Sequence, residues 1–210
     1  MAKQREGICK LCGQRQLLTF EHVPPHSAFN NQPAKRYPFE ESLKLFSGAD
    51  GRLPWDFDGL VGKTNQRGMG DYYLCQSCNN NTGNWYISEY SKLVHTFAHI
   101  LQSESPNERN EYSFTVYDVY PSRIAKALLV MFCDINHNCF NDEELRRFLL
   151  DRECSSLKNN RYSLFLYLTK SSMPRLQGLS VINKNGVSFC VSEIASSPWA
   201  LRYTLISLIQ

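Results

Sequence analysis

The sequence predicts an α+β protein: an N-terminal module held by a zinc ion, followed by a small α+β domain. Two Cys-x-x-Cys pairs lie in the first half of the chain, and this doubled spacing is typical of a zinc site. Apolar residues at helical spacing follow the second pair, whereas the second half contains short runs that alternate apolar and polar residues. We therefore expect a module over residues 1–104, with a long insertion at about 32–70, and a second domain over 105–210.

The zinc site is expected to be structural. Four thiolates complete the tetrahedral coordination of Zn²⁺ and leave no position for a reacting molecule. Gly13 supplies a tight turn that lets backbone amides approach the sulfur atoms. Any reaction would therefore fall to the residues that the ion positions. The predicted ligands are Cys9, Cys12, Cys75 and Cys78.

Composition limits the classes of protein to which the chain can belong. Its 210 residues are 42% hydrophobic and 20% charged, which is ordinary for a globular domain, and the net charge of +3 permits a nucleic-acid partner without requiring one. The apolar runs are too short to span a bilayer, and the charged N-terminus is unlike a signal segment. We expect a cytoplasmic protein without membrane contact, because a reducing compartment favours metal-bound cysteines over disulfides.

The N-terminal half is expected to form a hairpin, an insertion and a helix. A strand over 17–20 should run to the end at His22, because two prolines follow it closely. The insertion is rich in glycine and proline; we expect a short helix over 39–46 and otherwise loop that serves as a binding or lid element. From Asn79 a helix should present one apolar face, formed by Tyr86, Tyr90, Leu93, Val94, Phe97 and Leu101.

The second half begins after a polar linker over 103–110. Alternation predicts a strand over 112–116, and Pro121 is a typical first residue of a helix. Asn141 and Glu144 have the spacing of a capping box, which predicts a helix that ends at Leu150. The remaining predicted elements are a strand over 162–169, a hairpin over 181–191 with its turn at Asn185-Gly186, and a strand or helix over 201–209.

The order of the N-terminal features resembles that of the zinc-stapled HNH endonucleases, the ββα-metal nucleases. That order is Cys-x-x-Cys, strand, Glu-His-x-x-Pro, second strand, Cys-x-x-Cys-Asn, helix, and it covers roughly residues 7–90 without the insertion. The resemblance implies a treble-clef-like module in which a hairpin precedes a helix. It also implies hydrolysis of phosphodiester bonds, of DNA in preference to RNA, with Mg²⁺ or another divalent ion separate from the structural zinc.

The resemblance assigns roles to three residues. Glu21 would be the acidic ligand of the catalytic ion, His22 the general base, and Asn79 the ligand supplied by the helix. The chemistry agrees, because a neutral imidazole can take a proton from water and Mg²⁺ prefers oxygen ligands. Where the family carries a middle asparagine this chain has Gly70 and Asp71, so Asp71 is the candidate for orienting the base.

Cations in the insertion are candidate contacts for nucleic acid. Lys63 and Arg67 lie beside glycines and could grip a phosphate backbone, as could Lys35 and Arg36; the alternative is a solvated loop balanced by acidic residues. Gly62-Lys63-Thr64 is not a phosphate loop, because Phe57 stands where that motif requires glycine.

Other interpretations stay open. A non-catalytic zinc module that binds nucleic acid or protein is the alternative to a nuclease, and the second domain is a possible site for a protein partner or a homo-oligomer. His95 and His99 have a chelating spacing, but we expect them to face solvent or another domain. Cys133 is expected to be an ordinary core residue and not part of a second metal centre with Cys139.

Overall fold

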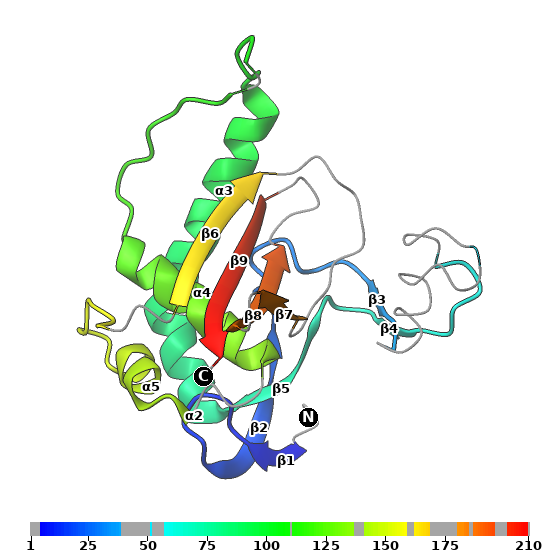
Figure 1. Cartoon of the computed structure of the whole chain (residues 1–210), viewed down its shortest axis with the longest axis vertical. Coiled ribbons are helices and arrows are strands. Elements are labelled where there is room, and N and C mark those ends of the chain that lie inside the picture. Colours follow the sequence, from blue (N-terminus) through cyan, green and yellow to red (C-terminus); the bar gives the residue numbers. More distant parts are fainter. Residues whose placement is uncertain are drawn as a thin grey trace.

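The structure is a computed structural model that describes residues 5–38, 51, 57–109, 111–136, 141–158, 162–168, 180–184, 187–195 and 201–209, with 166–168 and the last three stretches described by their backbone. It is a mixed protein of helices and small antiparallel sheets (Figure 1). Three predictions concern residues outside the described ranges. They are the helix over 39–46, the turn at Asn185-Gly186, and the expectation that Cys139 forms no second metal centre with Cys133.

The N-terminal sheet has three antiparallel strands in the order β1-β2-β5. β2 ends at His22, as predicted, and its last residue pairs with Gly70 at the start of β5. Helix α2 follows β5 without a loop, so this region has the expected ββα-like arrangement. The four elements are β1 (Arg5–Ile8), β2 (Arg15–His22), β5 (Gly70–Cys75) and α2 (Gln76–Thr82).

The insertion begins and ends in a two-stranded ribbon. β3 (Ala34–Arg36) pairs antiparallel with β4 (Lys63–Asn65), and the ribbon projects away from the helices (Figure 1). Spacing did not predict these strands, because each has three residues and their partners lie almost thirty residues apart in sequence. The insertion is therefore anchored by backbone pairing at its base and is not loop throughout.

A nearly continuous helical segment follows β5. α2 continues into a π-helical turn, η1 (Gly83–Ile87), and then into α3 (Ser88–Ser103). The helical segment thus starts at Gln76, three residues before Asn79, the residue at which the sequence predicted its start. Its apolar stripe points inward, since Tyr86, Tyr90 and Val94 are almost fully buried. These side chains belong to one core cluster with residues of α4 (Pro121–Ile135) and α5 (Glu143–Leu150).

Two predictions about the second half were wrong in detail. No strand forms over 112–116; the segment is irregular and lies along α3, with the Phe114 ring 5.3 Å from that of Phe97. Helix α5 is capped by Asp142, which accepts a hydrogen bond from the backbone of Leu145 at 3.0 Å, and not by a box at Asn141. The would-be box partner Glu144 instead accepts from the backbone of Lys158.

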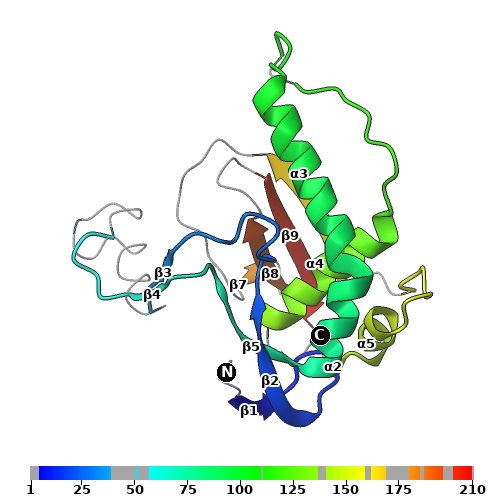
Figure 2. The same cartoon turned by 180° about the vertical axis from the view of Figure 1, so that it is seen from behind.

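The C-terminal strands form an antiparallel sheet in the order β6-β9-β8-β7. The sheet lies against α4 through β8 and β9. Figure 2 shows the molecule from the side opposite to that of Figure 1. The predicted strand, hairpin and terminal strand are confirmed at β6 (Tyr162–Leu168), β7 (Ser180–Lys184), β8 (Val187–Ala195) and β9 (Leu201–Ile209). In the described part of the chain, every helix is too short or too polar to span a bilayer.

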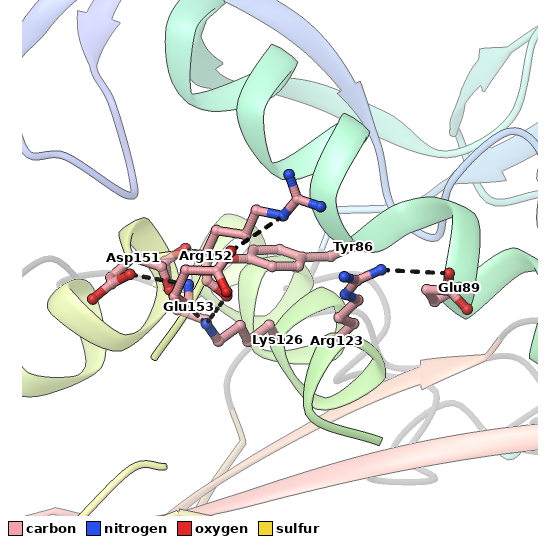
Figure 3. A network of polar contacts seen from close by, with 8 residues as sticks. Tyr86, Glu89, Arg123, Lys126, Asp151, Arg152 and Glu153 are labelled. Carbon is pink, nitrogen blue, oxygen red and sulfur yellow. Dashed lines mark hydrogen bonds and ion pairs between the residues drawn. The ribbon is translucent and has the colours of Figure 1, made fainter. Parts of the chain in front are cut away.

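A buried lysine joins the helices. Lys126 of α4 is 1% exposed and donates to the carbonyl oxygen of Asp151 at 2.6 Å, just beyond the end of α5 (Figure 3). The rings of Tyr86 and Phe148 flank its ammonium at 5.2 and 4.7 Å. A cation at a helix C-terminus interacts favourably with the helix dipole. Burial lowers the pKa of Lys126, and these contacts offset the cost of placing its charge there.

Candidate metal centre and active site

The four predicted zinc ligands come together in the structure. Their sulfur atoms lie within 4.8 Å of one another, and those of Cys12 and Cys75 are 4.0 Å apart. A zinc–sulfur distance of about 2.3 Å in a tetrahedron gives a sulfur–sulfur distance of about 3.8 Å. Within the described residues, this is the group of histidine, cysteine and acidic side chains that has the geometry of a metal site. The cluster could hold a structural ion such as zinc.

The thiols of the cluster cannot all ionise without a cation. A hydrogen bond from Cys78 lowers the pKa of Cys9 to about 4, and the same bond raises the pKa of Cys78. Burial raises the pKa of Cys12 to about 11. Cys9 is therefore the first of these three thiols to ionise, while Cys12 and Cys78 keep their protons near neutral pH. A divalent ion would remove this conflict, because thiolate is the form that binds metal.

The cluster fixes the position at which helix α2 leaves the sheet. Cys75 is both the last residue of β5 and the N-cap of α2, and Cys78 lies in the first turn. The turn carrying Cys9 and Cys12 is joined to β5 by a hydrogen bond from the backbone of Lys10 to Tyr73 at 2.9 Å. Gly13 in that turn has a φ of 73°, as its predicted role requires. Asn79 follows Cys78 directly, so the cluster also sets where Asn79 lies.

Asn79 lies against the face of β2 that carries Thr19 and Glu21. Its Nδ2 donates to Thr19 Oγ1 at 2.9 Å, and Thr19 Oγ1 donates to the carbonyl oxygen of Leu74 at 3.1 Å. A hydroxyl has one hydrogen, so Oγ1 can only accept from Asn79 and must face the amide nitrogen. Thr19 therefore turns Asn79 Oδ1 away from itself. Sequence reasoning missed Thr19, although its place two residues before Glu21 puts both on one face of the strand.

The side chains of Glu21 and Asn79 are hydrogen-bonded to each other. Burial raises the pKa of Glu21 to about 7, and hydrogen bonding from the Asn79 side chain opposes that rise. A carboxylate at this half-buried place loses part of its hydration, and one amide donor offsets only part of that loss. Glu21 is therefore a site at which bound cation and ionised carboxylate would favour each other.

The burial of Glu21 predicts a stability change in the protein without a catalytic ion. Below about pH 4.5 the carboxyl is protonated both folded and unfolded, whereas between 4.5 and about 7 the unfolded chain loses the proton first. The stability of the wild-type protein should therefore fall as the pH rises from about 4.5 to about 7. We expect Glu21→Gln to be more stable than wild type by about 2 to 3 kcal/mol at pH 8 and equally stable at pH 4, measured by urea unfolding with zinc bound.

Asp71→Asn is the matched control for this experiment. Asp71 is the cross-strand partner of Glu21, but its side chain is 39% exposed and pairs with Arg36. Its removal should produce no comparable gain at pH 8. Unfolding curves of wild type and Glu21→Gln that coincide at both pH values would contradict a raised pKa at Glu21.

The ring of His22 is held by a backbone carbonyl. Its Nε2 lies 3.0 Å from the oxygen of Arg67. Because a carbonyl can only accept, Nε2 must carry the hydrogen, which leaves Nδ1 of the neutral ring as the acceptor. Burial lowers the pKa of His22, although the bond to Arg67 partly opposes this, so the ring is neutral near pH 7.

His22 and Glu21 make different contacts. Glu21 lies with Asn79 on the α2 side, whereas the His22 ring contacts Phe20 at 5.0 Å and His26 at 5.4 Å between centroids. The structure thus assembles the acid and the amide directly. It places the imidazole at the adjacent last position of β2, held by separate contacts.

Asn30, which sequence reasoning missed, closes the loop after His22. Its Nδ2 donates to the carbonyl oxygens of Pro24 and Met69, and its Oδ1 accepts from the backbone of Met69 at 2.7 Å. Gly68 must be glycine there, because it has a φ of 95° and a Cβ would collide with the Asn30 backbone. Asn30 therefore secures the segment whose Arg67 carbonyl holds His22. No local spacing marks such a residue.

The other candidates fall at different places. Asp71 accepts from its neighbour's backbone and pairs with Arg36 at 3.4 Å, so it does not orient His22. Lys63 is exposed on β4, directly across the ribbon from Arg36. The side chain of Arg67 is also exposed.

The residues that the sequence analysis considered as possible further metal ligands on helices are His95, His99 and Cys133. His95 is exposed, as one of the two expected alternatives has it, and its Nε2 lies 2.8 Å from the carbonyl oxygen of Ser27, in the loop after β2 of the same predicted module. His99 is exposed, and the pair forms no metal site among the described residues. Cys133 is buried in the core, as predicted.

Comparisons with known proteins returned no significant match, whether against family models, curated proteins or solved structures. The likeness to HNH endonucleases therefore rests on the order of the motifs in this chain. It is accompanied by the four-cysteine cluster and by the ββα-like arrangement of β2, β5 and α2.

Proposed function

We propose that this protein is a metal-dependent endonuclease that hydrolyses DNA phosphodiester bonds through an HNH-type site. His22 is the general base, and Glu21 and Asn79 hold the catalytic ion. The observation that carries this proposal is the contact between the half-buried carboxyl of Glu21 and the amide of Asn79, which Thr19 orients. The next residue, His22, has an imidazole held by a hydrogen bond to a backbone carbonyl.

The donor atoms suit a hard divalent cation such as Mg²⁺. Glu21 offers a carboxylate, and Thr19 leaves Asn79 Oδ1 available as a second oxygen ligand. Two protein ligands leave coordination positions for water and phosphate. When bound, the ion would supply stabilisation of the negative charge on the scissile phosphate.

His22 would act on the attacking water. Its Nδ1 can accept the proton of that water, while Nε2 stays bonded to the Arg67 carbonyl. The same carbonyl stabilises the imidazolium that forms, because an oxygen acceptor favours the charged ring. The bond also limits rotation of the ring and so keeps Nδ1 in one direction.

The cations of the ribbon formed by β3 and β4 suit a polyanionic substrate. Arg36 and Lys63 are directly opposite each other on β3 and β4, and Lys35 precedes them. Like charges at directly opposed positions destabilise a sheet, whereas phosphates bound between them would relieve the repulsion. Arg67, whose backbone carbonyl bonds to His22, is a fourth exposed cation. We propose that Lys63 and Arg67 contact the DNA backbone.

A nicking assay on supercoiled plasmid tests the proposal. Zinc-loaded protein is incubated with Mg²⁺, Mn²⁺ or Ni²⁺, and conversion to open-circular DNA is measured against a chelator control. Ion-dependent nicking supports the nuclease. Absence of cleavage on plasmid and on single-stranded DNA with all three ions would overturn it and favour the non-catalytic zinc module.

Thr19 is expected to position the Asn79 ligand. Thr19→Val keeps the shape but removes the hydroxyl that accepts from Asn79, so the amide loses its fixed orientation. We expect about a tenfold loss in affinity for Mn²⁺, measured by titration of the zinc-loaded protein, which corresponds to about 1.4 kcal/mol. Thr19→Ser keeps the hydroxyl and should retain wild-type affinity. Equal Mn²⁺ affinity in wild type and Thr19→Val would exclude this role.

A further inference from the structure

A row of aromatic rings crosses the sheet at His22. It consists of Tyr72 on β5, Phe20 and His22 on β2, and His26 in the turn that follows. Successive ring centroids are 5.7, 5.0 and 5.4 Å apart, and each pair meets edge to face. We call these four residues the ring row. It is continuous from β5 to the loop that Asn30 closes.

Phe20 is exposed where a strand phenylalanine would normally be buried. It is 40% exposed, whereas Leu18, two residues earlier on the same strand, is 5% exposed. Its ring lies over Gly70, where a Cβ would stand 2.8 Å from a ring carbon. The glycine thus makes room for the ring to lie across β5. An apolar surface at the side of the candidate base stays open to solvent.

The residue whose carbonyl holds His22, the third member of the row, is itself a cation. Arg67 is exposed, and its carbonyl oxygen contacts His22. Aromatic rings interspersed with cations are the chemistry that binds single-stranded nucleic acid, because bases stack on the rings and phosphates pair with the cations. A base within a duplex has both faces covered by its neighbours and cannot use such a surface.

We propose that the ring row binds unpaired nucleotides, so that the DNA strand beside the candidate site is single-stranded. A base stacks on Phe20, and its phosphate lies between Arg67 and the ribbon. The location of this strand relative to cleavage rests on the proposed function, whereas the binding itself does not. A simpler role for Phe20, orienting the His22 ring, would leave DNA binding unchanged when Phe20 is removed.

Binding without a catalytic ion tests the proposal. Zinc-loaded protein is titrated into a fluorescently labelled single strand and into a hairpin duplex of equal length, with no other divalent ion present. We expect wild type to prefer the single strand. Phe20→Ala should weaken single-strand binding about tenfold or more, since stacking contributes about 1 to 3 kcal/mol per base. Phe20→Trp should bind and show additional quenching of tryptophan fluorescence when DNA is added.

Leu17→Ala is the matched control. Leu17 lies on the same strand, is 50% exposed and is not in the ring row. It should bind the single strand as wild type does. Equal losses in Leu17→Ala and Phe20→Ala, or no loss in Phe20→Ala, would overturn the proposal, as would a preference for duplex that is independent of Phe20.

The outcome is separable from that of the nicking assay. Single-strand binding that depends on Phe20, without cleavage under any ion, would retain the ring row and reject the nuclease. Ion-dependent nicking with unchanged binding in Phe20→Ala would retain the nuclease and reject the ring row.

Discussion

Replacing His22 with alanine is expected to lower ion-dependent DNA cleavage by about 10²- to 10⁴-fold, the usual contribution of a positioned general base. The hydrogen bond from Nε2 to the Arg67 carbonyl leaves Nδ1 as the proton acceptor, and alanine removes both. Zinc content and helical signal should not change, because the recorded partners of the His22 ring are Phe20, His26 and the Arg67 carbonyl. The rate of plasmid nicking under single-turnover conditions measures the effect.

Two further measurements separate a chemical role from a structural one. Imidazole added to the buffer should partly restore nicking by His22→Ala, since it supplies the missing base; a collapsed site would not respond. His99→Ala, which alters an exposed histidine on α3, should cleave as wild type does. If zinc-replete His22→Ala nicked DNA at the wild-type rate, His22 could not be the base.

Local patterns were sufficient to predict the groups that lie close together in sequence. The paired cysteines, the prolines after His22 and the spacing of Tyr86, Tyr90 and Val94 correctly predicted the cluster, the end of β2 and the buried helix face. Each of these features depends on chemistry within a few residues.

The supporting residues could not be predicted in this way. Thr19 acts on Asn79, which is 60 positions away, and Asn30 acts on Met69, which is 39 positions away. A hydroxyl or amide in isolation gives no sign of such a partner. Their roles follow from three-dimensional contacts that close only after β2 pairs with β5.

The alternation of apolar and polar residues wrongly predicted a strand over 112–116, because alternation describes side chains and not the pairing of backbone groups. A strand needs a neighbour for its backbone groups, and this segment lies beside a helix whose backbone groups are already bonded internally. The ribbon of β3 and β4 is the opposite case. It has a partner for each residue but too few residues to show a pattern.

Loss of one cluster cysteine is expected to release the metal and unfold the N-terminal module. Cys75 is 1% exposed and joins β5 to α2, so Cys75→Ser should reduce bound zinc to well below one ion per chain. Zinc sites of this kind contribute about 10 kcal/mol or more to folding of small domains. We expect a loss of at least about 3 kcal/mol in stability here, measured by thermal unfolding together with zinc content.

The place at which Cys75→Ser loses protection from hydrogen exchange distinguishes a metal centre from four ordinary buried thiols. Hydrogen exchange should rise in α2 and at Asn79, because the cluster sets where that helix leaves the sheet, and Mn²⁺ affinity at Glu21 should fall with it. Cys154→Ser changes a half-exposed cysteine outside the cluster and should keep both zinc and stability. Wild-type protein that folds fully without any bound metal, and a Cys75→Ser variant of equal stability, would show that the sulfur cluster is core packing alone.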